Sequence, residues 1–317
     1  MTKVLGILNF ESSEAKVEGL ADYRPISAVS FLGRYRILDF MISNFTNSKI
    51  DNIQVHIKSR PRSVIEHIHK TNYNINSKRG RIHLLHGEQP VHNEIYNNDI
   101  ASFMANMQFI EDSNASYVMV APSHFVYIQD FNEMLNYHIE SGNDITVLYQ
   151  NVANAKDSFM MCDTLEFEDK KRITSFAKNL GKYKNRDVSL ECYCMTKALF
   201  IELVEKAHAT SSLFWLRDVI ADSTKDLKVG GYQHKGYAAC INTLKAYYEA
   251  SMDLKDDALL RTLVSKNWPI HTMTNDSCPT LYKPGASVTG SIVGNGCEIE
   301  GTIINSVIGR GVVVKKG

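Results

Sequence analysis

Short apolar runs alternate with longer amphipathic stretches over the first two-thirds of the chain. Such runs predict strands, and apolar residues at helical spacing predict helices between them. The alternation is typical of an α/β domain built on a largely parallel sheet. We expect strands at Val4–Leu8, Ile53–Ile57, Ile82–Leu85, Tyr117–Val120 and Ile145–Tyr149, and helices at Tyr35–Asn47, Ser63–Lys70, Ile100–Asp112 and Asp130–Ser141.

Two local signals refine this prediction. Ser63 and Glu66 have the spacing of a capping box, which predicts that a helix begins there. In open α/β sheets, ligands bind beyond the carboxyl ends of the strands. A functional site is therefore expected at the turns after Leu8 and after Val120.

The pattern changes in the remaining third of the chain. Residues 150–240 have an irregular, mixed pattern, and Leu244–Val264 has helical spacing. A linker follows, marked by Pro269, Pro279 and Pro284.

The last thirty residues repeat one template. Val293–Ile299 and Ile308–Val314 each run from a branched apolar residue through two alternate glycines to another branched residue. This repetition predicts a parallel β-helix, whose coils bury their apolar faces by stacking. A glycine-rich β-hairpin is the alternative. Because the chain stops before a third copy, we expect a truncated array rather than one that has lost later coils.

Composition narrows the class of protein. The 317 residues are 44% hydrophobic and 22% charged, with 35 basic and 35 acidic side chains, which is typical of a globular protein. A broad nucleic-acid or membrane-binding face would need a basic excess, so neither partner is expected. No run approaches the roughly 20 apolar residues that span a bilayer, and the first apolar run is too short for a signal sequence.

Cysteine and histidine spacing gives no metal site. The six cysteines form no CxxC pair, which predicts free thiols in a reducing cytoplasm. Cys192 and Cys194 are expected on one face of a strand, in the core. His67 and His69 are two residues apart rather than the three or four that place two ligands on one helix face, so we interpret them as packing or surface residues.

Residues 31–48 (FLGRYRILDFMISNFTNS) closely resemble the segment behind the nucleotide loop of ADP-glucose pyrophosphorylases, the glucose-1-phosphate adenylyltransferases. Three further segments resemble that family in the same order. Tyr117–Leu135 resembles the region of its metal-binding turn, Arg217–Ile220 part of its sugar-binding region, and Leu244–Leu254 the stretch before its β-helix linker. The resemblance covers essentially the whole chain.

The resemblance implies three segments. Residues 1–243 would form a nucleotidyltransferase-like α/β domain with a Rossmann-like, mostly parallel sheet, and residues 244–281 a helix and linker. Residues 282–317 would begin a left-handed parallel β-helix of hexapeptide-type coils. Active members transfer an adenylyl group from ATP to glucose 1-phosphate, which commits the sugar to glycogen.

That chemistry requires glycines around the triphosphate, cations beside the reacting phosphorus and carboxylates for Mg²⁺. The loop at residues 9–14 has no glycine, and Glu11 and Glu14 add negative charge. Where the family has a lysine, this chain has Ile26. Ser123 and Cys240 stand at the two positions of its metal-binding aspartates. The resemblance therefore implies no catalytic residue and a lost Mg²⁺ site.

Other substrate positions are also altered. Phe176–Asn179 replaces the Glu-Lys-Pro element that contacts the sugar phosphate in the family. Ser189 and Asp218 match substrate-site positions, but without their partners we interpret them as vestigial, with weak sugar-phosphate binding left open.

Clustered basic residues suit a phosphorylated effector, with salt bridges or a solvated face as the alternative. In the helix of the 31–48 motif, Asp39, Ser43 and Asn44 are polar among apolar neighbours, which suggests helix and subunit contacts. The effector candidates are Arg24, Arg34, Arg36, Lys58, Arg60 and Arg62.

The sequence thus predicts a non-catalytic, cytoplasmic regulatory subunit. Its partner would be the catalytic subunit of ADP-glucose pyrophosphorylase in a hetero-oligomer, and a homo-oligomer alone is compatible with the pattern. One alternative is a weakly active adenylyltransferase. Another is a stand-alone sensor of sugar phosphate or nucleotide. A β-helix acyltransferase would need many more coils.

Overall fold

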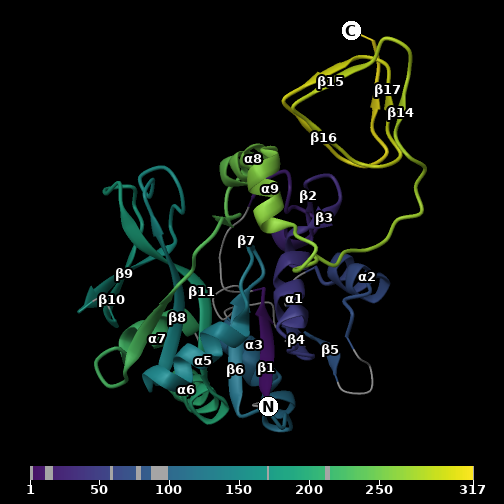
Figure 1. Cartoon of the computed structure of the whole chain (residues 1–317). Helices are drawn as coiled ribbons and strands as arrows, with labels where there is room; N and C mark the ends of the chain where they lie inside the picture. The colour runs from purple at the N-terminus through teal and green to yellow at the C-terminus, as the bar shows by residue number, and fades with distance from the viewer. Residues whose placement is uncertain are drawn as a thin grey trace.

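The computed structural model describes residues 3–10, 17–57, 60–75, 80–86, 99–169, 171–210 and 215–316. Within these residues, a nine-stranded sheet forms the centre of the molecule (Figure 1). Its strands lie in the order β5 (Arg81–Leu85), β4 (Asn52–His56), β1 (Val4–Asn9), β6 (Tyr117–Pro122), β11 (Arg186–Thr196), β8 (Ile145–Val152), β12 (Val229–Gln233), β10 (Arg172–Lys178) and β9 (Asp163–Glu168).

The sheet is mixed rather than largely parallel. β5, β4, β1 and β6 are parallel neighbours, as predicted, but β11 runs antiparallel to both β6 and β8. β10 is antiparallel to β9 and to β12. Residues 150–240, expected to be irregular, form much of this half. β9 and β10 are close in sequence, which favours antiparallel pairing, because parallel neighbours need a long crossover.

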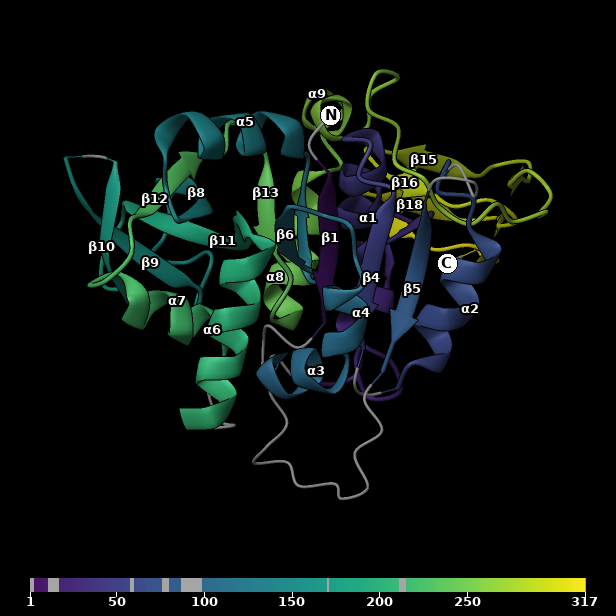
Figure 2. The same ribbon diagram turned by 90° about the horizontal axis from the view of Figure 1, so that it is seen from below.

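Helices cover both faces of the sheet, which gives three layers (Figure 2). One buried apolar cluster joins the sheet to α1, α2 and α5, and a second joins it to α3, α4, α6 and α7. The helices are α1 (Ile37–Asn47), α2 (Arg62–Lys70), α3 (Asp99–Ala105), α4 (Met107–Glu111), α5 (Phe131–Ser141), α6 (Lys197–Thr210), α7 (Leu216–Ser223), α8 (Leu244–Asp253), α9 (Asp257–Leu263) and the 3₁₀ turn η1 (Ile26–Ala28). No helix in this described part is long and apolar enough to cross a membrane.

Two predicted helix starts were wrong. Tyr35–Arg36 forms a short strand, β3, with β2 (Ser30–Phe31), so α1 begins two residues later than expected. Its capping box is made by Arg36 and Asp39, with the Arg36 N–H donating to Asp39 Oδ2 at 2.8 Å. The proposed box at Ser63 does not form, because α2 already begins at Arg62, directly after Pro61.

Two long predicted helices are each divided. The expected helix at residues 100–112 breaks at Asn106, between α3 and α4. The stretch from residue 244 to 264 breaks before Asp256, which caps α9 by accepting from the Leu259 N–H at 2.9 Å. A side-chain cap of this kind starts a new helix within an apolar pattern that is continuous over both.

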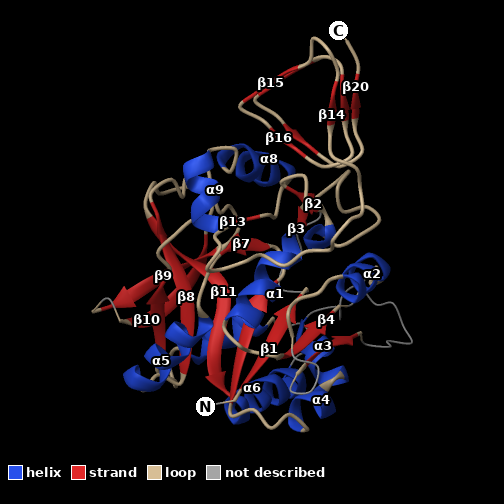
Figure 3. Cartoon of the chain, turned by 45° about the vertical axis from the view of Figure 1, so that its right-hand side comes forward, coloured by secondary structure: helices blue, strands red, loops and turns tan. Residues whose placement is uncertain are grey.

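The terminal residues form parallel stacks with a triangular outline (Figure 3). The parallel pairing agrees with the predicted coils and excludes a hairpin, whose strands would be antiparallel. Cys297, Ile299 and Ile303 fill the interior. The stacks are β14 (Leu281–Tyr282), β17 (Glu298–Ile299) and β20 (Val313–Val314); β15 (Ser287–Thr289) and β18 (Thr302–Ile304); and β16 (Ile292–Val293) and β19 (Val307–Ile308).

The polar residues of α1 make contacts within the chain, which agrees with the predicted helix contacts, and the subunit contacts stay a prediction. Ser43 Oγ accepts from the His271 N–H at 2.9 Å. Asn44 accepts from Trp268 Nε1 at 3.0 Å and donates to the Tyr127 carbonyl at 2.9 Å. The bonds to Trp268 and His271 hold the linker after α9 against α1 of the α/β domain.

Asp39 links α1 to two neighbouring segments. Its Oδ1 accepts from His67 Nε2 at 2.6 Å and from the Tyr73 hydroxyl at 2.7 Å. Asp39 is completely buried, and His67 and Tyr73 are nearly so. The carboxylate therefore joins α1 to α2 and to the segment that follows α2.

Candidate functional site

The positions predicted to have lost the metal ligands meet at one edge of the sheet. The Ser123 N–H, just after β6, donates to the Asn9 carbonyl at the end of β1, at 3.0 Å. β7 (Phe125–Tyr127) pairs with β13 (Ala238–Cys240), which places Cys240 opposite Phe125. The structure thus brings Ser123 and Cys240 to the carboxyl edge of β1 and β6, where the strand pattern predicted a site.

The groups present at this edge do not suit Mg²⁺. Ser123 is 2% exposed and Cys240 is 5% exposed, and Cys240 lies in the main apolar cluster with Cys162. Burial, and then the adjacent Cys162 thiol, raises the pKa of Cys240 well above its usual value. A protonated thiol is a poor ligand for a hard cation that prefers charged oxygen. Within the described ranges, no group of three or more His, Cys, Asp or Glu side chains gathers as a metal site.

Charged side chains near this edge are paired with one another. Lys178 Nζ lies 2.5 Å from Asp163 Oδ1, across the pair β9–β10. Arg217 Nε lies 3.8 Å from Asp218 Oδ1 in the first turn of α7. The Asp218 side chain is 48% exposed, and burial raises the pKa of its carboxyl group. Lys178 therefore does not present an uncompensated positive charge.

The remaining predicted positions have internal roles. Ser189 is fully buried, and its Oγ accepts from the Glu191 N–H at 3.1 Å. Ile26 lies in η1 and packs against the cluster that contains Phe31 and Ile37. The loop residues Glu11 and Glu14 lie outside the described residues.

The effector candidates do not form one site. Arg36 Nη1 donates to the Ser63 carbonyl at 2.7 Å, and Arg60 Nη1 donates to the Ala21 carbonyl. Arg62 is exposed and pairs with Glu66 at 3.1 Å. Arg24 is exposed, and Lys58 lies outside the described residues. Of these side chains, Arg36 and Arg62 make their contacts at the start of α2.

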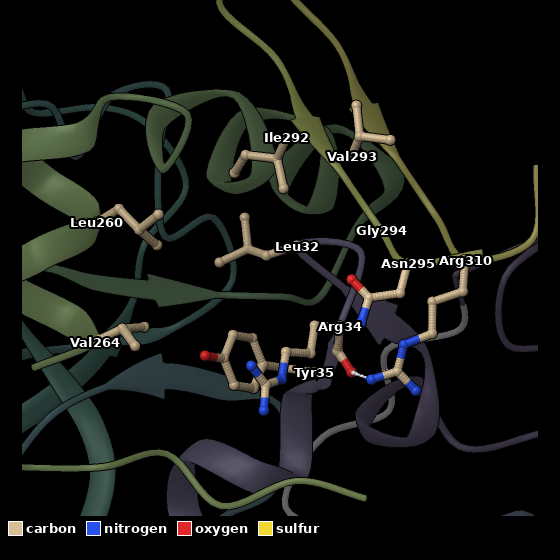
Figure 4. Close-up of a pocket in the computed structure, with 10 residues that line it drawn as sticks. All are labelled: Leu32, Arg34, Tyr35, Leu260, Val264, Ile292, Val293, Gly294, Asn295 and Arg310. Atoms are coloured by element: carbon tan, nitrogen blue, oxygen red, sulfur yellow. Dashed lines mark hydrogen bonds between the residues drawn. The ribbon is translucent and has the colours of Figure 1, made fainter. Parts of the chain in front are cut away.

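Arg34 instead lines a cavity of about 220 Å³ between the 31–48 motif, α9 and the terminal coils. Arg310 Nη2 donates to the Arg34 carbonyl at 3.4 Å (Figure 4). Leu32, Leu260 and Val264 provide an apolar wall. The sequence analysis missed Arg310, because its Gly-Arg-Gly setting marked a coil and gave no signal that it would meet Arg34.

Two glycines, Gly33 and Gly294, allow the backbones of the 31–48 motif and the coils to approach closely. Gly33 has φ +68°, and a Cβ there would lie 2.8 Å from the Ile308 carbonyl oxygen. A Cβ on Gly294 would lie 2.9 Å from the Gly33 carbonyl oxygen. The two backbones can therefore touch only where both residues lack a side chain.

Burial of His56 and His124 should make the protein less stable in acid. Burial lowers the pKa of His56 to about 3, and burial followed by the Arg217 charge lowers that of His124 to about 3. The unfolded chain takes up their protons near pH 6.5 and the folded state does not. Each histidine therefore removes on the order of 1.4 kcal/mol per pH unit as the pH falls below about 6.5. Burial raises the pKa of Asp99 to about 7. Because its folded form takes up a proton before the unfolded form does, Asp99 adds stability as the pH falls, which offsets the loss from about one histidine.

Urea unfolding between about pH 7.5 and pH 5 tests this balance. His56→Gln is expected to reduce the acid dependence by one histidine's contribution, on the order of 1.4 kcal/mol per pH unit below about pH 6.5. His69→Gln, at an exposed position of α2, is the matched control and should keep the wild-type slope. An H56Q variant with that same slope would contradict the assignment.

Comparisons with known proteins identify the family of this chain. The nucleotidyl transferase family matches residues 16–256. The chain is 30% identical over 325 residues to the glycogen biosynthesis protein GlgD of Geobacillus stearothermophilus, covering 99% of this chain and 82% of the relative. Identity to GlgD of Bacillus subtilis (strain 168) is 25% over 316 residues, with the same coverage. Identity to glucose-1-phosphate adenylyltransferase of G. stearothermophilus is 30% over 297 residues, covering 92% and 76%.

The chain therefore belongs to the nucleotidyl transferase family. Its relatives place it among the ADP-glucose pyrophosphorylase homologues of glycogen biosynthesis, which confirms the resemblance carried by the 31–48 motif.

Proposed function

We propose that this protein is a non-catalytic regulatory subunit that modulates an active glucose-1-phosphate adenylyltransferase in glycogen biosynthesis. The observation that carries the proposal is the pair of buried, uncharged groups at Ser123 and Cys240. They occupy the edge of the sheet where adenylyl transfer would need carboxylates and Mg²⁺. Alignment with GlgD proteins over 99% of the chain supports the same role.

The chemistry at this edge argues against turnover. Loss of one preorganised group that stabilises charge costs about 10²- to 10³-fold in rate. Here Ile26, Ser123 and Cys240 stand where three such groups would act. The protein is therefore proposed to need no Mg²⁺, and calorimetric titration with Mg²⁺ is expected to give no heat of binding.

Regulation would act through an oligomer with the active subunit. The protein would favour one conformation of its partner, and a coupling of about 1–3 kcal/mol would change substrate affinity about 5- to 150-fold. A phosphorylated effector would bind the cavity between Arg34 and Arg310, where two cations lie beside an apolar wall. This cavity touches both the α/β domain and the terminal coils, so a ligand there would alter how they pack.

The terminal coils are proposed to be a left-handed parallel β-helix. Their support is the three parallel stacks and the repeated Gly-containing template. An experimental structure of this segment would decide the hand of the coil.

Pyrophosphate release from ATP and glucose 1-phosphate tests the function. The protein alone is expected to give no turnover, and its addition to the catalytic subunit of the same organism should change the rate or the substrate affinity. Arg310→Ala is expected to weaken any response of the mixture to a phosphorylated effector. Robust turnover by the protein alone would contradict the proposal and favour an active adenylyltransferase.

A further inference from the structure

Two loops extend from the same end of the strand pair β9–β10. Residues 153–162 lead into β9, and residues 179–185 follow β10. Because the two strands pair antiparallel, both loops lie at one end of the pair. The Met161 N–H donates to the Asn179 carbonyl at 2.9 Å. The two loops therefore contact each other and form one surface at the end of the sheet.

Asn179 holds the first of these loops in an unfavourable conformation. Its side-chain nitrogen donates to three carbonyls of that loop at 2.8–3.0 Å, and Asn179 itself is buried. Phe159 and Met161 have φ +52° and +65°, in the left-handed region that favours glycine. Strain of this kind persists only where surrounding contacts fix it, and it is concentrated at functional sites. The fold therefore fixes the shape of this loop at a cost in local backbone energy.

The two loops present large apolar side chains to solvent. Met161, Leu180 and Tyr183 are 58%, 56% and 57% exposed. The Arg186 guanidinium lies over the Tyr183 ring, 3.9 Å from its centre, and also pairs with Glu166 at 2.6 Å. The ring is thus held in place although more than half of the residue is exposed. Tyrosine, methionine and arginine are enriched at protein interfaces, and a side chain that is already held loses little entropy on binding.

The charges around these apolar side chains are mainly positive. Lys156, Lys182 and Lys184 are exposed, and Asp157 is the single acidic residue in the two loop sequences. The backbone brings the loops close at this point, because a Cβ on Gly181 would lie 2.8 Å from the Lys156 carbonyl oxygen. An apolar patch among lysines is complementary to a partner segment in which acidic side chains surround an apolar anchor.

We propose that the patch of Met161, Leu180 and Tyr183, with its three lysines, binds an acidic segment of the catalytic adenylyltransferase subunit. The identity of this partner rests on the proposed function. The inference adds which face of this chain is bound and by what chemistry. The patch shares no residue with the cavity that Arg34 and Arg310 line, so docking and effector binding would use separate surfaces.

Calorimetric titration of the purified full chain with the catalytic subunit of the same organism measures the dissociation constant. Tyr183→Ala is expected to weaken binding about 10- to 100-fold, because it removes the aromatic anchor of the patch. Tyr248→Ala is the matched control, since this tyrosine of α8 is 61% exposed and lies outside the patch. It should bind as tightly as the wild type.

Charge reversal tests the acidic character of the partner segment. The double variant K182E/K184E is expected to weaken binding about 10-fold at low salt. Lys206→Glu, at an exposed position of α6, is the control and should change the dissociation constant by less than about twofold. Binding of the wild type should weaken as the salt concentration rises, because exposed charges are screened.

Three results would overturn the proposal. Y183A and K182E/K184E could both bind as tightly as the wild type, which would place the interface elsewhere and leave the proposed function intact. Wild-type binding that is independent of salt would exclude an acidic partner segment. A wild-type chain that does not bind the catalytic subunit would overturn the proposed function and this inference together.

Discussion

Asp39→Ala is expected to lower the free energy of unfolding by about 3–5 kcal/mol. The completely buried carboxylate accepts from His67 Nε2, the Tyr73 hydroxyl and the Arg36 N–H. Alanine leaves three donors without an acceptor, at a cost of about 1–3 kcal/mol for each that stays buried. Urea denaturation at neutral pH measures the loss.

Two variants control for this effect. Asp39→Asn retains one oxygen for His67 and Tyr73 but places its amide near the Arg36 N–H, so about half of the loss is expected. Asp112→Ala, at an exposed position, should change stability by less than about 0.5 kcal/mol. A D39A variant within about 1 kcal/mol of the wild type would show that water or rearrangement satisfies those donors.

Cys240→Asp is expected to destabilise the protein by several kcal/mol at pH 8, on the order of 3–5. The new carboxylate would lie in an apolar cluster with Cys162 and Phe125. The Glu191 charge, which already acts on the thiol at this position, would repel it. Both effects raise the pKa of the introduced group above its unfolded value, so its folded form binds protons more readily. Stability relative to the wild type should therefore recover as the pH falls from about 8 to 5.

Cys240→Ser is the control, because serine is of similar size and carries no charge. Its loss of stability should be smaller than that of C240D and independent of pH over this range. Adding Ser123→Asp to C240D restores both carboxylate positions. No pyrophosphate release is expected from the double variant, because Ile26 and the glycine-free loop remain. Clear turnover would show that the carboxylates alone were limiting.

These predictions rest on two kinds of information. The family, the strand positions in the first half of the sheet and the repeated coils were all predictable from sequence, because they follow from local periodicity and short motifs. The proposed loss of the substrate site also rests on sequence, since an uncharged residue at Ser123 or Cys240 needs no coordinates to notice. The parallel pairing of β1 with β4 and β6 agrees with that expectation.

Other features depended on contacts between distant residues. The sequence analysis expected helix and subunit contacts for Asp39, Ser43 and Asn44, and their partners include His67, His271 and Trp268 of the same chain. Polar residues on an apolar helix face indicate that partners exist. They do not say which segment provides them, because that segment is placed by the packing of the whole chain.

The sequence by itself determined the family, the α/β class, the parallel coils and the altered site residues, because each depends on residues that are close together in the sequence. Only the tertiary structure decided the antiparallel half of the sheet, the meeting of Arg34 with Arg310 and the burial of Glu191. Register and burial depend on long-range packing, and a left-handed φ in a strand becomes visible only when that packing is complete.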